Sequence, residues 1–447
     1  MPRRLKALLL VLLLAGCAGS SLFQPYPNRI AAVQAQIQRG NGDAALASLA
    51  NHVDDGDGLL YAQEAGRIAA LLGDTPASLD YYRQAMADYD QLDWRAIVSF
   101  TDISQQLGAA TVSENLLAYR GQAFERVMLH QQQALNYLWQ SDLEAALVEV
   151  RRADQAQILA QKTYRENLKS QRAISNASID AELTRLDRQA GNAPDSFINP
   201  YVLFSNAVIY EAAGQPNDAL IDLRKALQLR PENTLLQREV VRLACQLNID
   251  CDTLERQFGA PIPAPSQSGR LVILYETGTL PPRQQITIPF SWDSYYQQIA
   301  LPTYRGIQAP PSLLTVQLDA DILTTEPLAD LDQMAARSLR EQYPFILLRQ
   351  GIRLATKHNA NAWAERKGGD FGAISMQIFN ALTEQADRRS WLTLPRQAQA
   401  ATRHLHPGDY RLTAAGLQTE VAIAPGRTTL VWIAEQAGTR QIQTILI

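Results

Sequence analysis

The sequence predicts a multidomain α then α+β protein, in which an N-terminal α-solenoid of paired helices is followed by a β-sandwich-like domain with a helical insertion. From about residue 28 to residue 254 the chain is rich in Ala, Leu, Gln, Arg and Glu, and apolar residues recur at spacings of three and four, which indicates amphipathic helices. Three prolines between residues 261 and 265 mark a boundary. Beyond it, short apolar runs separated by turn residues predict strands.

The first 16 residues have the pattern of an export signal. A basic segment, residues 3 to 6, precedes an apolar run over residues 7 to 15, which at about 1.5 Å per residue is too short to span a hydrocarbon core of about 30 Å. Leu-Ala-Gly directly before Cys17 resembles the bacterial lipobox, in which the signal is cut before the cysteine and its thiol carries lipid. We therefore expect Cys17 to be an acylated N-terminus. An ordinary secretory signal with an incidental cysteine is the alternative.

The residue after the cysteine bears on the destination of the chain. Inner-membrane lipoproteins commonly carry Asp there, whereas this chain has Ala18. We expect a protein held by its lipid on the outer membrane and facing the periplasm. Without the three basic residues of the signal, 41 − 3 = 38 basic residues stand against 45 acidic ones, a formal charge of −7. This balance leaves no basic footprint for a nucleic-acid partner.

Two cysteines remain after the lipidation site, Cys245 and Cys251. An even remainder in an oxidising compartment favours a disulfide, which over so short a loop would contribute about 2 kcal/mol in the chain-entropy model. Two buried free thiols are an alternative. A metal site is disfavoured, because no matching Cys or His cluster flanks the pair.

Residues 17 to 258 form the predicted helical domain, and its clearest repeat lies between residues 200 and 233. Small, apolar and turn residues fall there at the spacing of a tetratricopeptide (TPR) repeat, a family of stacked antiparallel helix pairs. Small residues belong where the two helices cross closely, a glycine where the first helix ends, and a proline after the second. These positions are Ala207, Tyr210, Gly214, Ala219, Leu223, Ala226 and Pro231.

The same pattern recurs less clearly upstream, around Gly40, Gly73 and Asp142. Such an array has a concave groove that usually binds an extended or helical segment of another protein. Positions 204, 205 and 208 carry Phe, Ser and Val, so the Lys and Asn clamp with which some TPR proteins grip a terminal carboxylate is not present there. The alternative is that the helices only hold the C-terminal domain away from the membrane.

Residues 259 to 268 are the predicted Pro-rich linker, and residues 269 to 447 the β-rich domain with its helical insertion at about 328 to 386. Strands are expected over residues 270–276, 285–290, 297–302, 313–318, 391–394, 399–404, 409–413, 418–423, 428–434 and 441–447. The insertion would follow the fourth of them.

A charged loop in the insertion is the candidate partner-binding site of this domain. It contains Arg366, Lys367, Gly368, Gly369, Asp370 and Phe371. Paired glycines permit backbone geometries closed to other residues, and Asp370 could cap the helix that follows. The alternatives are a tight turn with a helix cap and a loop that binds a partner or ligand. The residue order does not fit a phosphate-binding P-loop.

No pattern in the chain specifies catalysis. GxSxG, HExxH, SxxK and Walker sequences do not occur, and His404 and His406 have no third ligand nearby in sequence. We therefore expect no catalytic residue, no metal and no cofactor.

The lipobox, the repeats and the strings LVILYETG, ERKGGDFGA and ADRRSWLTLP together resemble a poorly characterised family of proteobacterial TPR lipoproteins. Members are often encoded beside an outer-membrane lipoprotein that activates penicillin-binding proteins. The resemblance implies a non-catalytic role in cell-wall or envelope assembly, and it transfers no catalytic residue.

The leading hypothesis is a lipid-anchored scaffold that binds another envelope protein through its TPR groove. One alternative is an accessory lipoprotein of secretion or pilus assembly. Another is an enzyme acting on glycan or peptide, for which Glu365 and Asp370 are the nearest candidates for acids.

Overall fold

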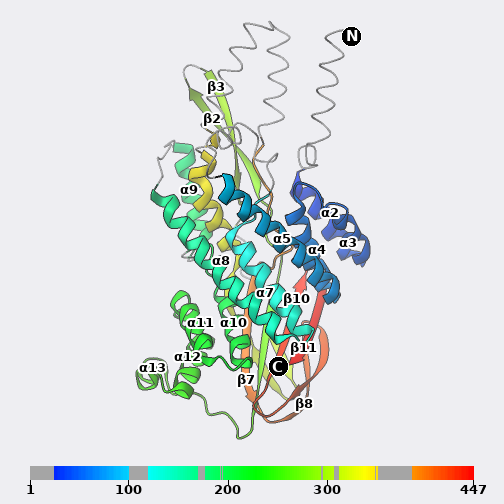
Figure 1. Ribbon diagram of the computed structural model, residues 1–447, viewed down its shortest axis with the longest axis vertical. Helices are drawn as coiled ribbons and strands as arrows, with labels where there is room; N and C mark the ends of the chain where they lie inside the picture. The colour runs from blue at the N-terminus through cyan, green and yellow to red at the C-terminus, as the bar shows by residue number, and fades with distance from the viewer. Residues whose placement is uncertain are drawn as a thin grey trace.

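The computed structural model describes residues 25–99, 119–169, 177–191, 193, 195–292, 295–306, 312–347, 349–350 and 385–447. The predicted lipidation site Cys17 and the predicted loop from Arg366 to Phe371 lie outside these residues. Within them, the predicted fold class is confirmed: a region of paired helices precedes mixed β-sheets that carry a helical insertion (Figure 1).

Helices fill the first half of the chain. They are α2 (Tyr26–Gln38), α3 (Gly42–Ala50), α4 (Gly58–Leu71), α5 (Thr75–Ser99), α7 (Ala123–Trp139), α8 (Leu143–Lys169), α9 (Ala177–Ala190), α10 (Pro200–Ala212), α11 (Pro216–Leu229), α12 (Thr234–Leu247) and α13 (Cys251–Phe258). Local chemistry sets several of their ends. The Asn199 side chain accepts hydrogen bonds from the first turn of α10, and Asn233 does the same for α12.

Consecutive helices pack as pairs, namely α4 with α5, α7 with α8, and α10 with α11. Each pair is joined by a short turn containing one residue with positive φ: Gly73 at 80°, Ser141 at 61° and Gly214 at 72°. Small residues allow the close approach within a pair. A Cβ on Gly66 of α4 would lie 2.4 Å from the Tyr82 ring of α5.

The strands form two larger sheets and a hairpin. They are β1 (Gly269–Thr277), β2 (Gln284–Trp292), β3 (Tyr295–Thr303), β4 (Thr315–Leu318), β5 (Asp321–Thr324), β6 (Glu326–Asp330), β7 (Gln397–Leu405), β8 (Gly408–Ala414), β9 (Leu417–Ile423), β10 (Thr428–Gln436) and β11 (Thr439–Leu446). The five-stranded sheet has the order β11-β10-β1-β7-β6, and the four-stranded sheet the order β5-β4-β8-β9. Only the β1–β10 pair of the five-stranded sheet is parallel.

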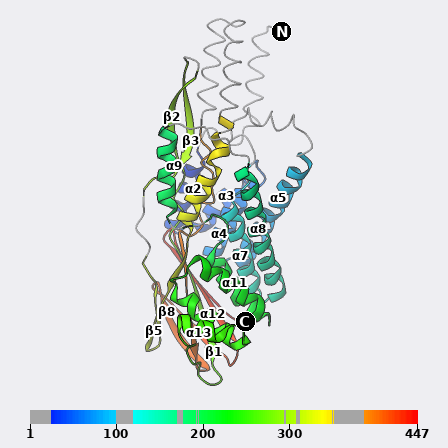
Figure 2. The same ribbon diagram turned by 90° about the vertical axis from the view of Figure 1, so that its left-hand side faces the viewer.

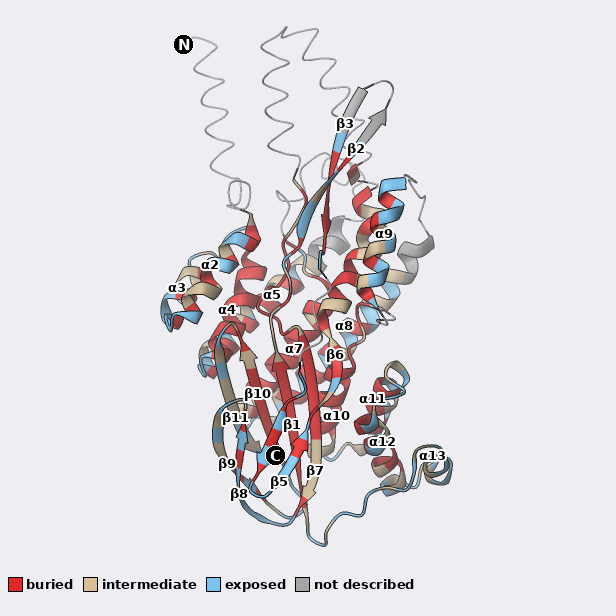
Figure 3. Cartoon of the chain, turned by 180° about the vertical axis from the view of Figure 1, so that it is seen from behind, coloured by how far each residue is buried: buried red, intermediate tan, exposed pale blue. Residues whose placement is uncertain are grey.

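Alternate residues of β1 point to opposite faces of the five-stranded sheet. Leu271 and Ile273 belong to a buried cluster shared with the four-stranded sheet, which makes the two sheets a sandwich. Val272 and Leu274 belong to the cluster that contains the helices. The middle strands are therefore buried on both faces (Figure 3).

The β2–β3 hairpin extends away from the two sheets and runs beside α9 (Figure 2). Arg185 of α9 holds it there by donating hydrogen bonds to the Thr303 hydroxyl and the Tyr304 carbonyl.

The insertion connects β6 to β7, and its described part is helical over residues 331–347 and 349–350. The predicted strands differ from the observed ones at two places. The segment Trp391–Leu394 is a turn, because its backbone is hydrogen-bonded to side chains of helices instead of a neighbouring strand. The short strands β5 and β6 escaped prediction, so the insertion follows the sixth strand instead of the fourth.

Candidate functional site

The first helices of the three pairs, where a repeat array would present its groove, contact the β-rich region of the same chain. One face of α4, α7 and α10 lies against the five-stranded sheet and against residues 385–396 (Figure 3). Polar side chains on these faces are fully or almost fully buried: Glu64 and Arg67 of α4, and Glu125, Gln131 and Gln132 of α7. The face expected to receive another protein is thus covered by the chain itself.

The Glu64 carboxylate accepts hydrogen bonds from backbone amides of the turn Trp391–Leu394. Its Oε1 accepts hydrogen bonds from the Leu392 amide at 2.7 Å and the Tyr26 hydroxyl at 2.8 Å. Its Oε2 accepts hydrogen bonds from the Thr393 amide at 2.9 Å and from the Thr393 hydroxyl. Burial raises the pKa of Glu64 to about 7, because the hydrogen bonds to its carboxylate only partly offset the loss of water.

Glu125 of α7 binds Trp391, the first residue of this turn. Its Oε1 accepts a hydrogen bond from the Trp391 amide at 2.8 Å, and its Oε2 accepts hydrogen bonds from the Tyr119 hydroxyl at 2.6 Å and the Gln122 amide at 3.0 Å. The Trp391 ring is fully buried and meets the Tyr82 ring edge-on at 5.8 Å. Two carboxylates from two helix pairs therefore fix residues 391 to 393.

Arg67 and Glu276 form the most buried ion pair of this contact, with both side chains inaccessible to solvent and 2.6 Å between Nη1 and Oε2. The guanidinium also donates hydrogen bonds to the Gln132 and Gln436 side chains, each at 2.8 Å. Glu276 in turn accepts a hydrogen bond from the Tyr201 hydroxyl at 2.8 Å. The network joins α4, α7 and α10 to β1 and β10.

A second network lies at the other end of the same contact. Arg270 of β1 is 2.8 Å from both Glu211 and Glu239, and Arg242 is also 2.8 Å from each of these carboxylates. Burial alone would raise the pKa of Glu239, but Arg270 and Arg242 outweigh it and lower the pKa to about 2. Two arginines thus face two carboxylates, and their charges balance. This is the pattern of a structural ion-pair network.

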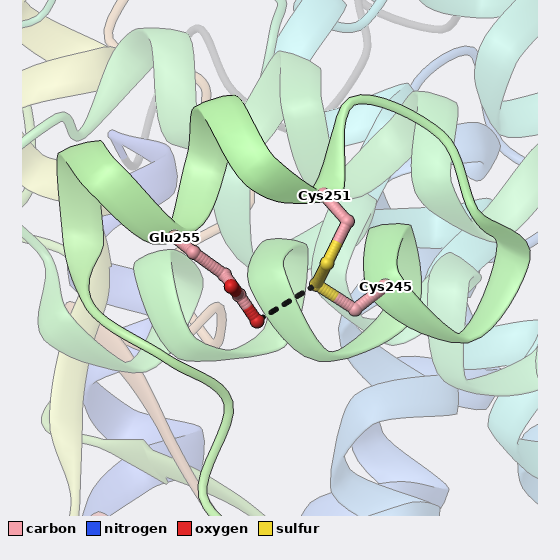
Figure 4. Close-up of side chains that lie close together, drawn as sticks. All are labelled: Cys245, Cys251 and Glu255. Carbon is pink, nitrogen blue, oxygen red and sulfur yellow. Dashed lines mark hydrogen bonds between the residues drawn. A yellow bond between two sulfur atoms is a disulfide. The ribbon is translucent and has the colours of Figure 1, made fainter.

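Cys245, at the end of α12, and Cys251, at the start of α13, are joined by a disulfide (Figure 4). The Cys245 sulfur lies 3.7 Å from a carboxylate oxygen of Glu255. These three are the one group of potential metal ligands found close together in the part of the chain that the structure describes. With both sulfurs in the disulfide, they offer no thiolate to a metal.

A cationic cavity of about 320 Å³ lies near the start of α7. Its walls come from Arg283 before β2 and Pro302 of β3, from the helix over residues 331–347 and its continuation, and from the segment leading to Trp391. Four of its lining residues are arginines: Arg120, Arg283, Arg349 and Arg389.

A second hollow, of about 270 Å³, opens between α5, α7, α8 and the helix over residues 331–347. We call it the outer groove. Its lining includes Tyr89, Arg126, Leu159, Tyr164, Phe197 and Phe345. Leu159 is 47 % exposed, and its neighbour Ile158 is 67 % exposed.

The residues predicted to pack within the best repeat all lie at the α10–α11 pair. Ala207, Ala219, Leu223 and Ala226 are at most 1 % exposed, and Tyr210 is 6 % exposed. Gly214 forms the turn between the helices with positive φ, and Pro231 follows the end of α11.

Sequence reasoning did not identify the carboxylates and arginines that join the two halves. A signal for them exists. Glu64 and Arg67 lie in the run YAQEAGRIAALL, and Glu276 ends the strand LVILYE. An isolated charge in an otherwise apolar segment is buried only when it is paired or hydrogen-bonded, so these residues predict buried polar contacts without indicating their partners.

No protein-family model, curated protein or solved structure matches the chain. Among the described residues, no helix is long and apolar enough to cross a membrane.

Proposed function

We propose that this protein is a lipid-anchored scaffold of the bacterial envelope, facing the periplasm from the outer membrane, which binds another envelope protein and catalyses no reaction. The anchor is Cys17. The observation that carries the partner-binding part of the proposal is the exposed Leu159 in the lining of the outer groove, with the exposed Ile158 next to it on α8, since exposed apolar side chains beside a concavity mark interaction sites.

Because the β-rich region covers the face of α4, α7 and α10, we infer that the partner binds a different surface. Glu64, Glu125 and Arg67 are committed to the chain's own residues 276 and 391–393, so a foreign segment would have to displace several buried hydrogen bonds. Polar side chains in the lining of the outer groove bind one another, as Ser196 does Glu341 at 2.6 Å, but Leu159 remains 47 % exposed there. The rim of the outer groove combines the apolar side chains of α8 with the ion pair of Arg126 and Asp93 at 2.7 Å, an arrangement of apolar centre and polar rim that suits a protein partner.

A lipid on Cys17 would keep the folded body close to the membrane. Pro25 is the first described residue, eight residues after Cys17, and eight extended residues reach about 28 Å at most. Partners within reach are therefore proteins of the same membrane or of the adjacent periplasm.

In-cell photo-crosslinking tests the proposal. A photoreactive amino acid at position 158 or 159 should yield the same crosslinked envelope protein, and Leu159→Glu should abolish the crosslink from position 158. Position 221 is the matched control, because Ile221 is 52 % exposed on α11 and away from the outer groove. Equal capture from position 221, or no common protein from positions 158 and 159, would contradict the proposal.

The anchor is tested separately. Incorporation of labelled palmitate should depend on Cys17, and Cys17→Ser should move the protein from the membrane fraction to the soluble periplasm. Label that persists in Cys17→Ser would contradict the lipidation site.

A further inference from the structure

We propose that the cationic cavity is a binding site for a phosphate group. The cavity holds about 320 Å³ beside the start of α7 and shares with the outer groove only part of its wall. The observation that points to a ligand is the guanidinium of Arg283.

Arg283 is a buried cation that makes no direct ion pair among the described residues, although Asp387 and Glu125 lie close enough to interact with its charge. Its residue is only 4 % exposed, and its one hydrogen bond runs from Nε to the Tyr304 hydroxyl at 3.3 Å. Its Nη2 is buried and has no hydrogen-bond partner. Arginine stays protonated in proteins, and an unpaired buried charge costs several kcal/mol. An anion in the cavity would supply the missing partner.

Most of the charged residues that line the cavity are positive, like Arg283. Four arginines line the cavity against one acidic residue, Asp387. Asp387 is committed to Arg389, from whose Nη2 it lies 2.8 Å, and Arg389 also contacts Asp57 of the helical region. Arg389 is thus matched by two carboxylates, whereas Arg283 lines the same cavity with no carboxylate within ion-pair distance among the described residues. Arg120 also lines the cavity and is exposed.

A phosphate group fits this arrangement better than a single carboxylate. It carries up to two negative charges and accepts hydrogen bonds on several oxygens, and guanidinium groups bind it through paired N–H donors. Arg389 is fixed by Asp57 and Asp387, so part of the site is already ordered before the ligand arrives. The phosphate could belong to a soluble phosphate ester or to the headgroup of an anionic phospholipid, since the lipid anchor would keep the body near a membrane.

Calorimetry and thermal unfolding of the full-length protein in non-ionic detergent test the site, with glycerol 3-phosphate and inorganic phosphate as probes at constant ionic strength. Both probes should bind and raise the midpoint of unfolding, because a ligand that binds only the folded state stabilises it. Arg283→Gln keeps a polar group near Tyr304 but removes the charge, and should weaken binding at least tenfold. Arg120→Gln, an exposed position, should weaken it severalfold without affecting the fold.

Arg411→Gln is the matched control, because Arg411 is an exposed arginine on β8, outside the lining of the cavity. A purely structural Arg283 would make Arg283→Gln less stable with and without phosphate. A binding site predicts instead that Arg283→Gln is at least as stable as the parent protein without phosphate and less stable than it with phosphate. Binding that is unchanged in both Arg283→Gln and Arg120→Gln would overturn the proposal.

Hydrogen exchange in lipid nanodiscs distinguishes the two sources. Protection of the amides at residues 119–122 in phosphatidylglycerol but not in phosphatidylcholine indicates a lipid headgroup. Protection in phosphatidylcholine only after glycerol 3-phosphate is added indicates a soluble ester. No protection under either condition, or equal protection in Arg283→Gln, would contradict a phosphate site.

Discussion

Arg67 of α4 and Glu276 of β1 are 209 positions apart in sequence, and their charged groups meet at 2.6 Å with no solvent access to either side chain. Arg67 also lies over the Trp432 ring, with its guanidinium carbon 5.4 Å from the ring centroid. The pair thus lies within the contact between helices and sheet. It binds the two halves into one body.

Removing one member of this pair should destabilise the protein strongly. Arg67→Met leaves the Glu276 carboxylate buried without its cation, and we expect a loss of about 3–5 kcal/mol in the free energy of unfolding. The double variant Arg67→Met/Glu276→Gln should lose less than the sum of the two single variants, because no uncompensated charge remains. Urea denaturation monitored by circular dichroism measures all four corners of the cycle.

A surface pair is the control for this cycle. Arg238 and Glu326 are 3.0 Å apart, with the Arg238 side chain 50 % exposed. Arg238→Gln should cost no more than about 1 kcal/mol. Equal losses at the buried and the exposed pair would show that burial of Arg67 carries no special energetic weight.

Stability should fall as pH rises from about 4.5 to 7. The pKa of Glu64 is raised by burial from 4.5 to about 7, so the folded state binds a proton that the unfolded state has already released. Its contribution to stability is complete below about pH 4.5 and is lost as pH rises towards 7, with a slope of at most about 1.4 kcal/mol per pH unit. Urea unfolding at a series of pH values from 5 to 8 measures this slope.

Two further carboxylates serve as checks on that pH profile. Burial, with the neighbouring Asp154, raises the pKa of Asp222 to about 6, so Asp222→Asn should remove part of the slope and Glu64→Gln another part. Glu239 acts in the opposite sense. Because its pKa is lowered to about 2, its contribution is present above about pH 4.5 and is lost in acid. A flat profile between pH 5 and pH 7 in the parent protein would contradict the raised pKa values.

The sequence predicts the helix pairs well because their determinants are local. Gly214 and the small residues Ala207 and Ala219 specify a turn and a close crossing within 34 residues, and the continuous apolar run of β10 lies within nine. The contact between helices and sheet could not be predicted in the same way. The Glu64 hydrogen bonds to Leu392 and Thr393 span more than 300 residues, and no local pattern indicates which charge finds which partner.

The turn at Trp391–Thr393 shows the same limit at a single segment. Its residues have the strand-forming character of β-branched and aromatic side chains. It forms a turn instead, because the Glu125 and Glu64 carboxylates accept hydrogen bonds from its backbone amides. Tertiary contacts thus override local preference.

The helical region should not fold without the β-rich region. A fragment of residues 25–258 would expose the apolar faces of α4, α7 and α10 and would leave Glu64, Arg67 and Glu125 without partners. We expect it to aggregate or to unfold without a cooperative transition in circular dichroism. The full-length protein should unfold in one transition, and cleavage within the exposed stretch 259–268 should leave the two pieces associated. A fragment that melts cooperatively at the temperature of the whole chain would contradict this expectation.

Loss of the disulfide should affect only one end of the helical region. The loop between Cys245 and Cys251 is short, and α13 contains no buried residue. In Cys251→Ser, hydrogen exchange of the α13 amides should approach that of an unfolded segment, whereas exchange in α10 and α11 should not change. Mass spectrometry of peptides from both regions measures the difference. Faster exchange throughout α10 would mean that the disulfide supports the wider fold.

Enlarging a small residue at a helix crossing should strain the α10–α11 pair. Ala219 is inaccessible to solvent at the start of α11, so the extra methyl groups in Ala219→Leu must displace α10, and overpacking of this kind costs about 1–3 kcal/mol. Ile221→Leu is the matched control, since Ile221 lies on the same helix and is 52 % exposed. Urea midpoints of the two variants compare them directly. If Ala219→Leu changed the midpoint no more than Ile221→Leu, the crossing would have room for a larger side chain, and the small residue would not be what sets the separation of the two helices.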